Sequence, residues 1–226
     1  MRAYATNSNG TGYGNQVQFT TVWDGTCSAF TSPGVRKEFM CQNLGADVTA
    51  DPFTPSWKLN GDYYQWGRNV VAAAGPTGPD DSQSNSGLIV GWNNTSSDNG
   101  SWSDASKTAN DPCPKNYRVP TSSEWSGVLN NNTSQLIGTW SFLVSNYSSS
   151  LKLENTFYLP TAGMRVYNSG MLDKRGIYGC YWTSTEILNT YAYPLVFNYN
   201  ITYSYLETSF NRTVRTTGMS VRCIAE

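Results

Sequence analysis

The most informative stretch of this chain reads Asp111-Pro-Cys-Pro-Lys-Asn-Tyr-Arg-Val-Pro-Thr-Ser-Ser-Glu-Trp125. It contains a capping box, because the hydroxyl of Thr121 and the carboxylate of Glu124 can each accept a hydrogen bond from the other residue's backbone amide. Such a pair marks the first turn of an α-helix. The sequence therefore predicts that a helix begins directly after Thr121.

The predicted helix is short. Trp125, Val128 and Leu129 share one helical face, which we expect to pack on the core. Pro120 precedes the cap and Asn130-Asn131-Asn132 follows the apolar face, and both are boundary signals. The helix is therefore confined to about three turns.

Downstream of this helix, residues 151–226 have the pattern of strands and turns. Large apolar and aromatic residues stand at every second position, and many of the residues between them are small or polar. The large residues are Leu195, Phe197, Tyr199, Ile201, Tyr203 and Tyr205. We expect Leu195 and Phe197 to face the core.

Upstream, residues 23–67 carry short strand-like pieces separated by prolines and end in an aromatic cluster. Residues 70–110 are mostly Gly, Ser, Asn, Asp and Pro, which predicts long loops. Disorder rarely retains large aromatic residues, and these loops contain Trp92 and Trp102. We expect the two tryptophans to anchor ordered loops; the alternative is that they are exposed platforms for a carbohydrate.

Residues 1–22 are set apart from the rest. Gln16-Val-Gln-Phe-Thr-Thr21 alternates like a strand and follows a turn rich in Gly and Asn at residues 7–14. An isolated hairpin is marginal in water, so this segment is either the tail of an upstream module or a strand used by the main domain. We favour the tail, and expect the chain to be a piece of a longer protein whose export signal lies upstream.

The five cysteines predict disulfides. Without any histidine they cannot form a Cys/His zinc site, and their spacing is too wide for an all-cysteine site. Two bridges can form in fifteen ways. We favour Cys27 with Cys41, a local loop, and Cys113 with Cys223, a long closure, which leaves Cys180 unpaired and buried; five reduced core cysteines are the alternative.

Composition excludes some classes of function. Charged residues make up 14% of the chain, as do aromatic residues, and the formal net charge is -1. No basic run is present that could neutralise phosphates, so we expect no nucleic-acid partner. No window reaches the roughly 18 apolar residues that a membrane span needs, so we expect no direct membrane insertion.

Several stretches, in order along the chain, resemble the Fibrobacter succinogenes major paralogous domain. Beside the stretch quoted above they are Phe39-Met-Cys-Gln-Asn-Leu44, Gly61-Asp-Tyr-Tyr-Gln-Trp-Gly-Arg68, Tyr158-Leu-Pro-Thr-Ala-Gly-Met-Arg165, Gly179-Cys-Tyr-Trp-Thr-Ser-Thr185 and Ser220-Val-Arg-Cys223. The resemblance covers residues 23–226. Arg2-Ala-Tyr-Ala-Thr-Asn7 with Val17-Gln-Phe-Thr20 is similar to the last strands of a fibronectin-type-III-like module, which would be cut here.

This resemblance implies the fold and the setting. The family occurs in surface and secreted proteins of Bacteroidetes, and its fold is similar to the C-type-lectin-like fold of formylglycine-generating enzyme. We therefore expect an α+β chain with twisted, mainly antiparallel sheets, few short helices and long ordered loops. Residues 1–22 are expected to be the tail of an upstream β-sandwich-like module or a linker, and residues 23–226 the C-type-lectin-like domain.

The resemblance does not extend to catalysis. Formylglycine-generating enzyme uses a thiol pair near its closing Arg-Cys strand, whereas Asn211 stands near where a cysteine would be needed. No histidine is present to act as a general base, and no nucleophile elbow occurs. Glu186 and Glu207 could form a glycosidase-like pair, but we expect them to be solvated or salt-bridged. The prediction is that the chain is not an enzyme.

No cofactor is expected, although calcium is an alternative. Oxygen ligands occur in a loop-rich region at Asp80, Asp81, Asn85 and Asp98. The calcium-loop pattern is incomplete, because Ser86 stands at the glycine position and Trp92 at the closing glutamate position. A solvated acidic loop is the expected structure.

The C-terminal region is the predicted recognition face. Of the 32 residues at positions 186–217, 17 are Asn, Tyr, Ser or Thr, the residues that dominate antibody-like binding surfaces. The composition also resembles the variable regions that diversity-generating retroelements write, which likewise end just before a closing core strand, so a retroelement-diversified variable protein is one form of this expectation. The expected ligand-binding residues, all facing outward, are Asn189, Tyr199, Asn200, Tyr203, Tyr205 and Asn211.

These observations predict an extracellular or cell-surface adhesin-type module, at a pilus tip or on a multidomain exoprotein. Its expected partner is a host or bacterial surface protein or a glycan. The alternative is a non-binding structural module, in which the tyrosine-rich face packs against a neighbouring domain.

Overall fold

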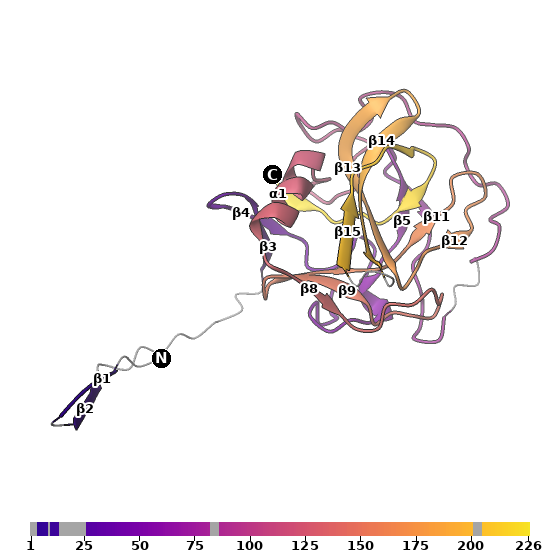
Figure 1. Ribbon diagram of the computed structural model, residues 1–226. Helices are drawn as coiled ribbons and strands as arrows, with labels where there is room; N and C mark the ends of the chain where they lie inside the picture. The colour runs from indigo at the N-terminus through magenta and orange to yellow at the C-terminus, as the bar shows by residue number, and fades with distance from the viewer. Residues whose placement is uncertain (1–3, 9, 14–25, 82–85, 201–204) are drawn as a thin grey trace.

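The computed structural model describes residues 4–8, 10–13, 26–81, 86–200 and 205–226. In this part of the chain the fold is β-rich, and its sheets are built from antiparallel strand pairs (Figure 1). One α-helix and one 3-10 helix accompany the sheets in the described ranges. No helix among these residues is long and apolar enough to cross a bilayer.

The expected helix is present as α1, Ser122–Asn131. Both hydrogen bonds of the capping box form: the Glu124 amide donates to the Thr121 hydroxyl at 3.0 Å, and the Thr121 amide donates to the Glu124 carboxylate at 2.8 Å. Arg118 holds that carboxylate at 2.6 Å. Burial raises the pKa of Glu124, but these hydrogen bonds and Arg118 outweigh burial, so the pKa is lowered. The prediction of this helix is confirmed.

Four sheets make up the main body. The first has the order β3-β4-β18-β7, with bounds Cys27–Ser32, Val35–Phe39, Ile224–Ala225 and Tyr117–Arg118. The second has the order β12-β11-β17-β5-β6, with bounds Leu172–Asp173, Met164–Arg165, Gly218–Met219, Tyr63–Gln65 and Val71–Ala73. A 3-10 turn, η1, spans Trp57–Leu59.

The other two sheets come from the second half of the chain. The third has the order β10-β9-β8, with bounds Phe157–Pro160, Ser150–Leu153 and Ser134–Ile137. The fourth has the order β13-β14-β15, and β16 also pairs with β14; their bounds are Tyr178–Leu188, Tyr191–Asn200, Tyr205–Ser209 and Thr213–Val214.

The helix lies close to strand β3. Gly127 makes this approach possible, because a Cβ at this position would lie 1.7 Å from the carbonyl oxygen of Thr31. The side chain of Asn132 then completes the contact by bonding to both the amide and the carbonyl of Phe30. Trp125 and Val128 are fully buried in the core beneath. A short capped helix is therefore locked onto the first sheet.

The closing segment, residues 218–225, joins the sheets. Strand β17 pairs with β5 and β11, and β18 pairs with β4 and β7. Between them, Ser220 exchanges backbone hydrogen bonds with Cys180 and Trp182 of β13. The amides of Met40 and Leu44 donate to the carbonyls of Cys223 and Val221, both at 2.9 Å. One short stretch of chain therefore connects three of the four sheets.

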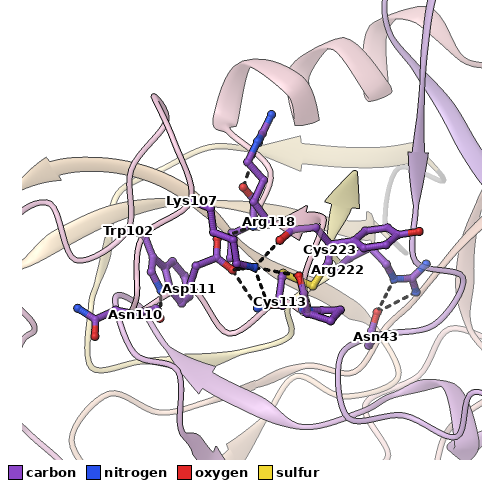
Figure 2. Close-up of a disulfide and its surroundings, with 12 residues drawn as sticks. Asn43, Trp102, Lys107, Asn110, Asp111, Cys113, Arg118, Arg222 and Cys223 are labelled. Carbon is purple, nitrogen blue, oxygen red and sulfur yellow. Dashed lines mark hydrogen bonds and ion pairs between the residues drawn. A yellow bond between two sulfur atoms is a disulfide. The ribbon is translucent and has the colours of Figure 1, made fainter. Parts of the chain in front are cut away.

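Both favoured disulfides are formed, Cys27–Cys41 and Cys113–Cys223, and Cys180 is a buried free thiol. Beside Cys113 the ammonium of Lys107 donates to the carbonyls of Cys113, Pro114 and Tyr117 and pairs with Asp111 at 3.5 Å (Figure 2). Lys107 therefore holds together the loop that carries the Cys113–Cys223 disulfide. Disulfides are typical of proteins that fold in an oxidising compartment.

The loop tryptophans are anchors, as expected. Trp92 and Trp102 are 8% and 1% exposed. The indole N–H of Trp102 donates to the Asn110 carbonyl at 2.7 Å, and that of Trp92 donates to the carbonyls of Tyr167 and Thr216. They are therefore not exposed carbohydrate platforms, and the loops around them are held to the core.

The N-terminal hairpin lies earlier than the sequence predicted. Strand β1 is Tyr4–Asn7 and β2 is Gly10–Tyr13, with Tyr4 opposite Tyr13. The stretch at residues 7–14, expected to be only a turn, therefore contains the second strand. That strand is rich in glycine, so it lacks the alternating apolar residues by which a strand is recognised in a sequence. The strand expected at residues 16–21 lies outside the described residues.

The two disulfides should contribute unequally to stability. They join residues separated by 110 and 14 positions, and a bridge that closes a longer loop removes more entropy from the unfolded chain. The double variant Cys113→Ser/Cys223→Ser should lose about 4.7 kcal/mol of unfolding free energy and Cys27→Ser/Cys41→Ser about 3 kcal/mol, measured by urea denaturation. Equal losses would contradict this ranking.

Candidate functional site

The sheet of β13, β14 and β15 has two faces with different roles. On one face Tyr181 and Leu195 lie opposite each other and are fully buried, together with Phe197. A Cβ at Gly179, opposite Phe197, would lie 2.0 Å from its ring, so glycine makes room for the phenyl group. The expectation that Leu195 and Phe197 line the core is confirmed.

The second face of this sheet borders a cavity of about 400 Å³. Its lining includes Cys180 and Val196, which are paired across β13 and β14. The remaining lining residues come from the start of β14, from β11, β12, β16 and β17, and from the chain beside them: Met164, Val166, Tyr167, Asp173, Lys174, Tyr191, Arg212, Thr213, Val214, Thr217 and Met219. This volume lies in the range of small-ligand sites.

The cavity has an apolar floor. Cys180 and Met219 are each 1% exposed, and Val196 and Met164 pack against the same buried cluster. Burial raises the pKa of the Cys180 thiol to about 12. Because the thiolate is the reactive form of cysteine, this thiol acts as an apolar wall and not as a nucleophile.

Charged side chains line the same cavity. The guanidinium of Arg212 lies 5.2 Å from the ring centre of Tyr191, and the ammonium of Lys174 lies 4.8 Å from that of Tyr178. Neither cation takes part in the ion pairs found among the described residues. Asp173 is the only carboxylate among the lining residues. The lining therefore carries two cations and one anion.

Further along the same face lie polar strand positions. Asn198 pairs with Tyr178 of β13. On this side of β14, Asn198 is the next residue after Val196, and Asn200 follows it. Both asparagines are half-buried. The cavity and these amide side chains thus share one face of a rigid sheet.

Of the predicted ligand-binding residues that the structure describes, Asn189 and Asn200 lie near opposite ends of β14. Asn189 is exposed at the β13–β14 turn, where its side chain accepts a hydrogen bond from Asn99 at 2.9 Å. Asn211 is exposed and precedes Arg212 of the cavity lining. Asn200 lies at the far end of β14, opposite Tyr205.

Tyr199 differs from the expectation. Tyr199 is half-buried and not outward, because strand alternation places it on the same side as Phe197, and its ring meets that of Trp140 edge-on at 6.1 Å. Tyr205 lies in strand β15. Tyr203 lies outside the described residues.

At the turn between β13 and β14, Arg215 holds the loop at residues 97–100 against the β13–β14 hairpin. Its guanidinium is buried, lies 4.2 Å from the ring centre of Trp66 and bonds to the carbonyl of Ser97, the side chain of Asn99 and the carbonyl of Leu188. It also pairs with the carboxylate of Glu186 at 3.2 Å. Glu186 is therefore salt-bridged, as expected, and Glu207 stands opposite Asn198 in strand register, not opposite Glu186.

The acidic loop shows ordinary turn bonding where it is described. One oxygen of Asp81 accepts hydrogen bonds from the amide and the hydroxyl of Thr77. Within the described ranges, no three His, Cys, Asp or Glu side chains gather so that they could hold a metal ion. Asn85 of the calcium alternative lies outside the described residues.

Sequence reasoning missed most of the cavity. Met164, Lys174 and Arg212 lie far apart in the chain and come together only because β17 pairs with β11 beside β13. The available signal was the basic residue next to Asn211, inside a segment already recognised as rich in binding residues. Pairing between distant short strands carries no signal in a single sequence.

Comparison with known proteins yields no match: no family model, no curated protein and no solved structure matches this chain. The resemblance to the major paralogous domain stays a prediction from the motifs quoted above.

Arg215 should be required to keep the loop at residues 97–100 ordered against the β13–β14 hairpin. In Arg215→Met the loop at residues 97–100 loses its bonds to the hairpin, so the amide of Gly100, which donates to Glu186, should exchange hydrogen at least tenfold faster. Unfolding free energy should fall by about 2 kcal/mol. The control is Arg36→Met, which removes an exposed arginine from β4. An unchanged exchange rate at the Gly100 amide would show that Arg215 is not needed to order this loop.

Proposed function

We propose that this chain is an extracellular or cell-surface ligand-binding domain of the adhesin type, with the C-type-lectin-like fold of the major paralogous domain family. Antiparallel sheets, one short capped helix in the described residues and long loops pinned by tryptophan support the proposed fold. The two disulfides support an extracellular setting. The ligand would be a host or bacterial surface protein or a glycan.

One observation carries this proposal. A cavity of about 400 Å³ with an apolar floor and charged side chains in its lining opens on the face of β13 and β14 that also carries Asn198 and Asn200. An apolar pocket with a few convergent polar groups is the usual form of a binding site. The surrounding strands are fixed by the core, so the pocket exists before any ligand arrives.

A structural module is the second candidate. Phe142, Leu143 and Val144 are consecutive, and they are 64%, 59% and 43% exposed. Contiguous exposed apolar residues suit contact with a neighbouring domain. In this version the chain would link or stabilise a longer surface protein without binding a separate ligand.

An array of host proteins, bacterial surface proteins and glycans separates the two candidates. The test variant is Asn198→Arg/Asn200→Arg, which places two bulky cations on the proposed face; the control is Ser134→Arg/Gln135→Arg, at two exposed positions of strand β8 in another sheet. Wild type and control should bind the same ligand, and the test variant should bind at least tenfold more weakly. Failure of wild type to bind anything, or equal binding by all three proteins, would contradict the proposed function.

A further inference from the structure

We infer that the cavity beside β14 takes an apolar side chain of a partner protein together with a carboxylate next to that side chain. This inference rests on the proposed function and narrows its ligand from proteins and glycans to proteins.

The floor favours an apolar side chain. Its surface is formed by the thioethers of Met164 and Met219, the thiol of Cys180 and the isopropyl group of Val196. None of these groups is a strong hydrogen-bond donor or acceptor. A sugar placed on them would lose the hydration of its hydroxyls without replacement, which is unfavourable. An aliphatic or aromatic side chain would gain from burial there.

The thioethers also make the floor adaptable. Methionine side chains are unbranched and polarisable, and they pack well against aromatic rings. Met164 lies on β11 and Met219 on β17, two strands that are direct neighbours in the second sheet. A flexible pair of side chains on a fixed backbone suits an inserted ring.

The charges favour a carboxylate. Arg212 and Lys174 line the cavity, and each cation lies near a tyrosine ring and not near a carboxylate in the ion pairs of the described residues. A guanidinium presents a planar fork that matches a carboxylate with two hydrogen bonds. With Asp173 as the only anion of the lining, the site keeps an excess of one positive charge. An acidic group beside the inserted side chain would balance it.

A protein can offer both groups from one short segment. Interfaces commonly bury an aromatic anchor in a preformed pocket, with charged groups at its edge. Asn198 and Asn200 lie further along the same face and make the surface beside the cavity polar, as the rim of an interface commonly is. A glycan would need polar groups on the cavity floor, where the structure has methyl groups and sulfur.

The experiment is a titration with small probes that represent the two groups. N-acetyl-tryptophan carries an indole and a carboxylate, and N-acetyl-tryptophanamide is its neutral counterpart. Binding is followed by NMR of methionine methyl groups, because Met164 and Met219 report from the floor and Met171, exposed and outside the lining, serves as the internal reference. The acid should shift the two floor methyls and bind about fivefold more tightly than the amide.

Variants assign the two parts of the recognition. Arg212→Gln and Lys174→Gln should each reduce the preference for the acid. The matched control is Lys152→Gln, since Lys152 also lies over a tyrosine ring, at 5.9 Å from that of Tyr158, but outside the cavity. Val196→Phe should fill the cavity and abolish binding of both probes; if that variant fails to fold, Val214→Phe serves the same purpose.

The outcomes separate this inference from the proposed function. Equal affinity for acid and amide, no shift of the floor methyls, or unchanged binding in the filled variant would overturn the inference. A methyl glycoside that competes with N-acetyl-tryptophan would also overturn it. If the array described above finds a glycan ligand while the probes fail, the proposed function stands and this inference falls.

Discussion

The rest of the structure depends on one buried guanidinium, that of Arg222. It is fully buried, and none of the ion pairs among the described residues includes it. It bonds instead to the side chain of Asn43 at 2.8 and 3.1 Å (Figure 2). It also donates to the carbonyls of Met40 and Cys41. Burial lowers its pKa to about 10, so it stays charged at neutral pH. A buried charge without these acceptors would be very costly, and the closing segment has to lie where they are.

This constraint explains how a rigid scaffold and an open face coexist. Because Arg222 fixes the closing segment, the neighbouring Cys223 meets Cys113 and the backbone of Ser220 meets β13. The sheet of β13 and β14 is then held on both faces: Tyr181, Leu195 and Phe197 are buried on one, and Cys180 and Trp182 are buried on the other beside the cavity. Arg212, which lines the cavity on that face, is exposed. A binding surface on such a scaffold is preorganised.

Local signals in the sequence predicted local structure well. The capping box at Thr121, the two loop tryptophans and the buried Leu195 are each specified by neighbours in the chain. The inward side of Tyr199 was also readable, since its spacing from Phe197 puts both on one face, but the binding composition of the segment outweighed that spacing. The cavity could not be predicted, because strands of two residues such as β11 and β17 gain their pairing from the whole core and not from their own pattern.

The most direct test of this account is native-state hydrogen exchange on the intact chain. The account predicts that the amides of Met40, Leu44, Trp182 and Ser220, all bonded to or within the closing segment, exchange only through global unfolding. It predicts that amides of the edge strand β15 exchange through local opening with a lower free energy. If the closing-segment amides exchanged as readily as those of β15, the closing segment would not be the support on which the binding face rests.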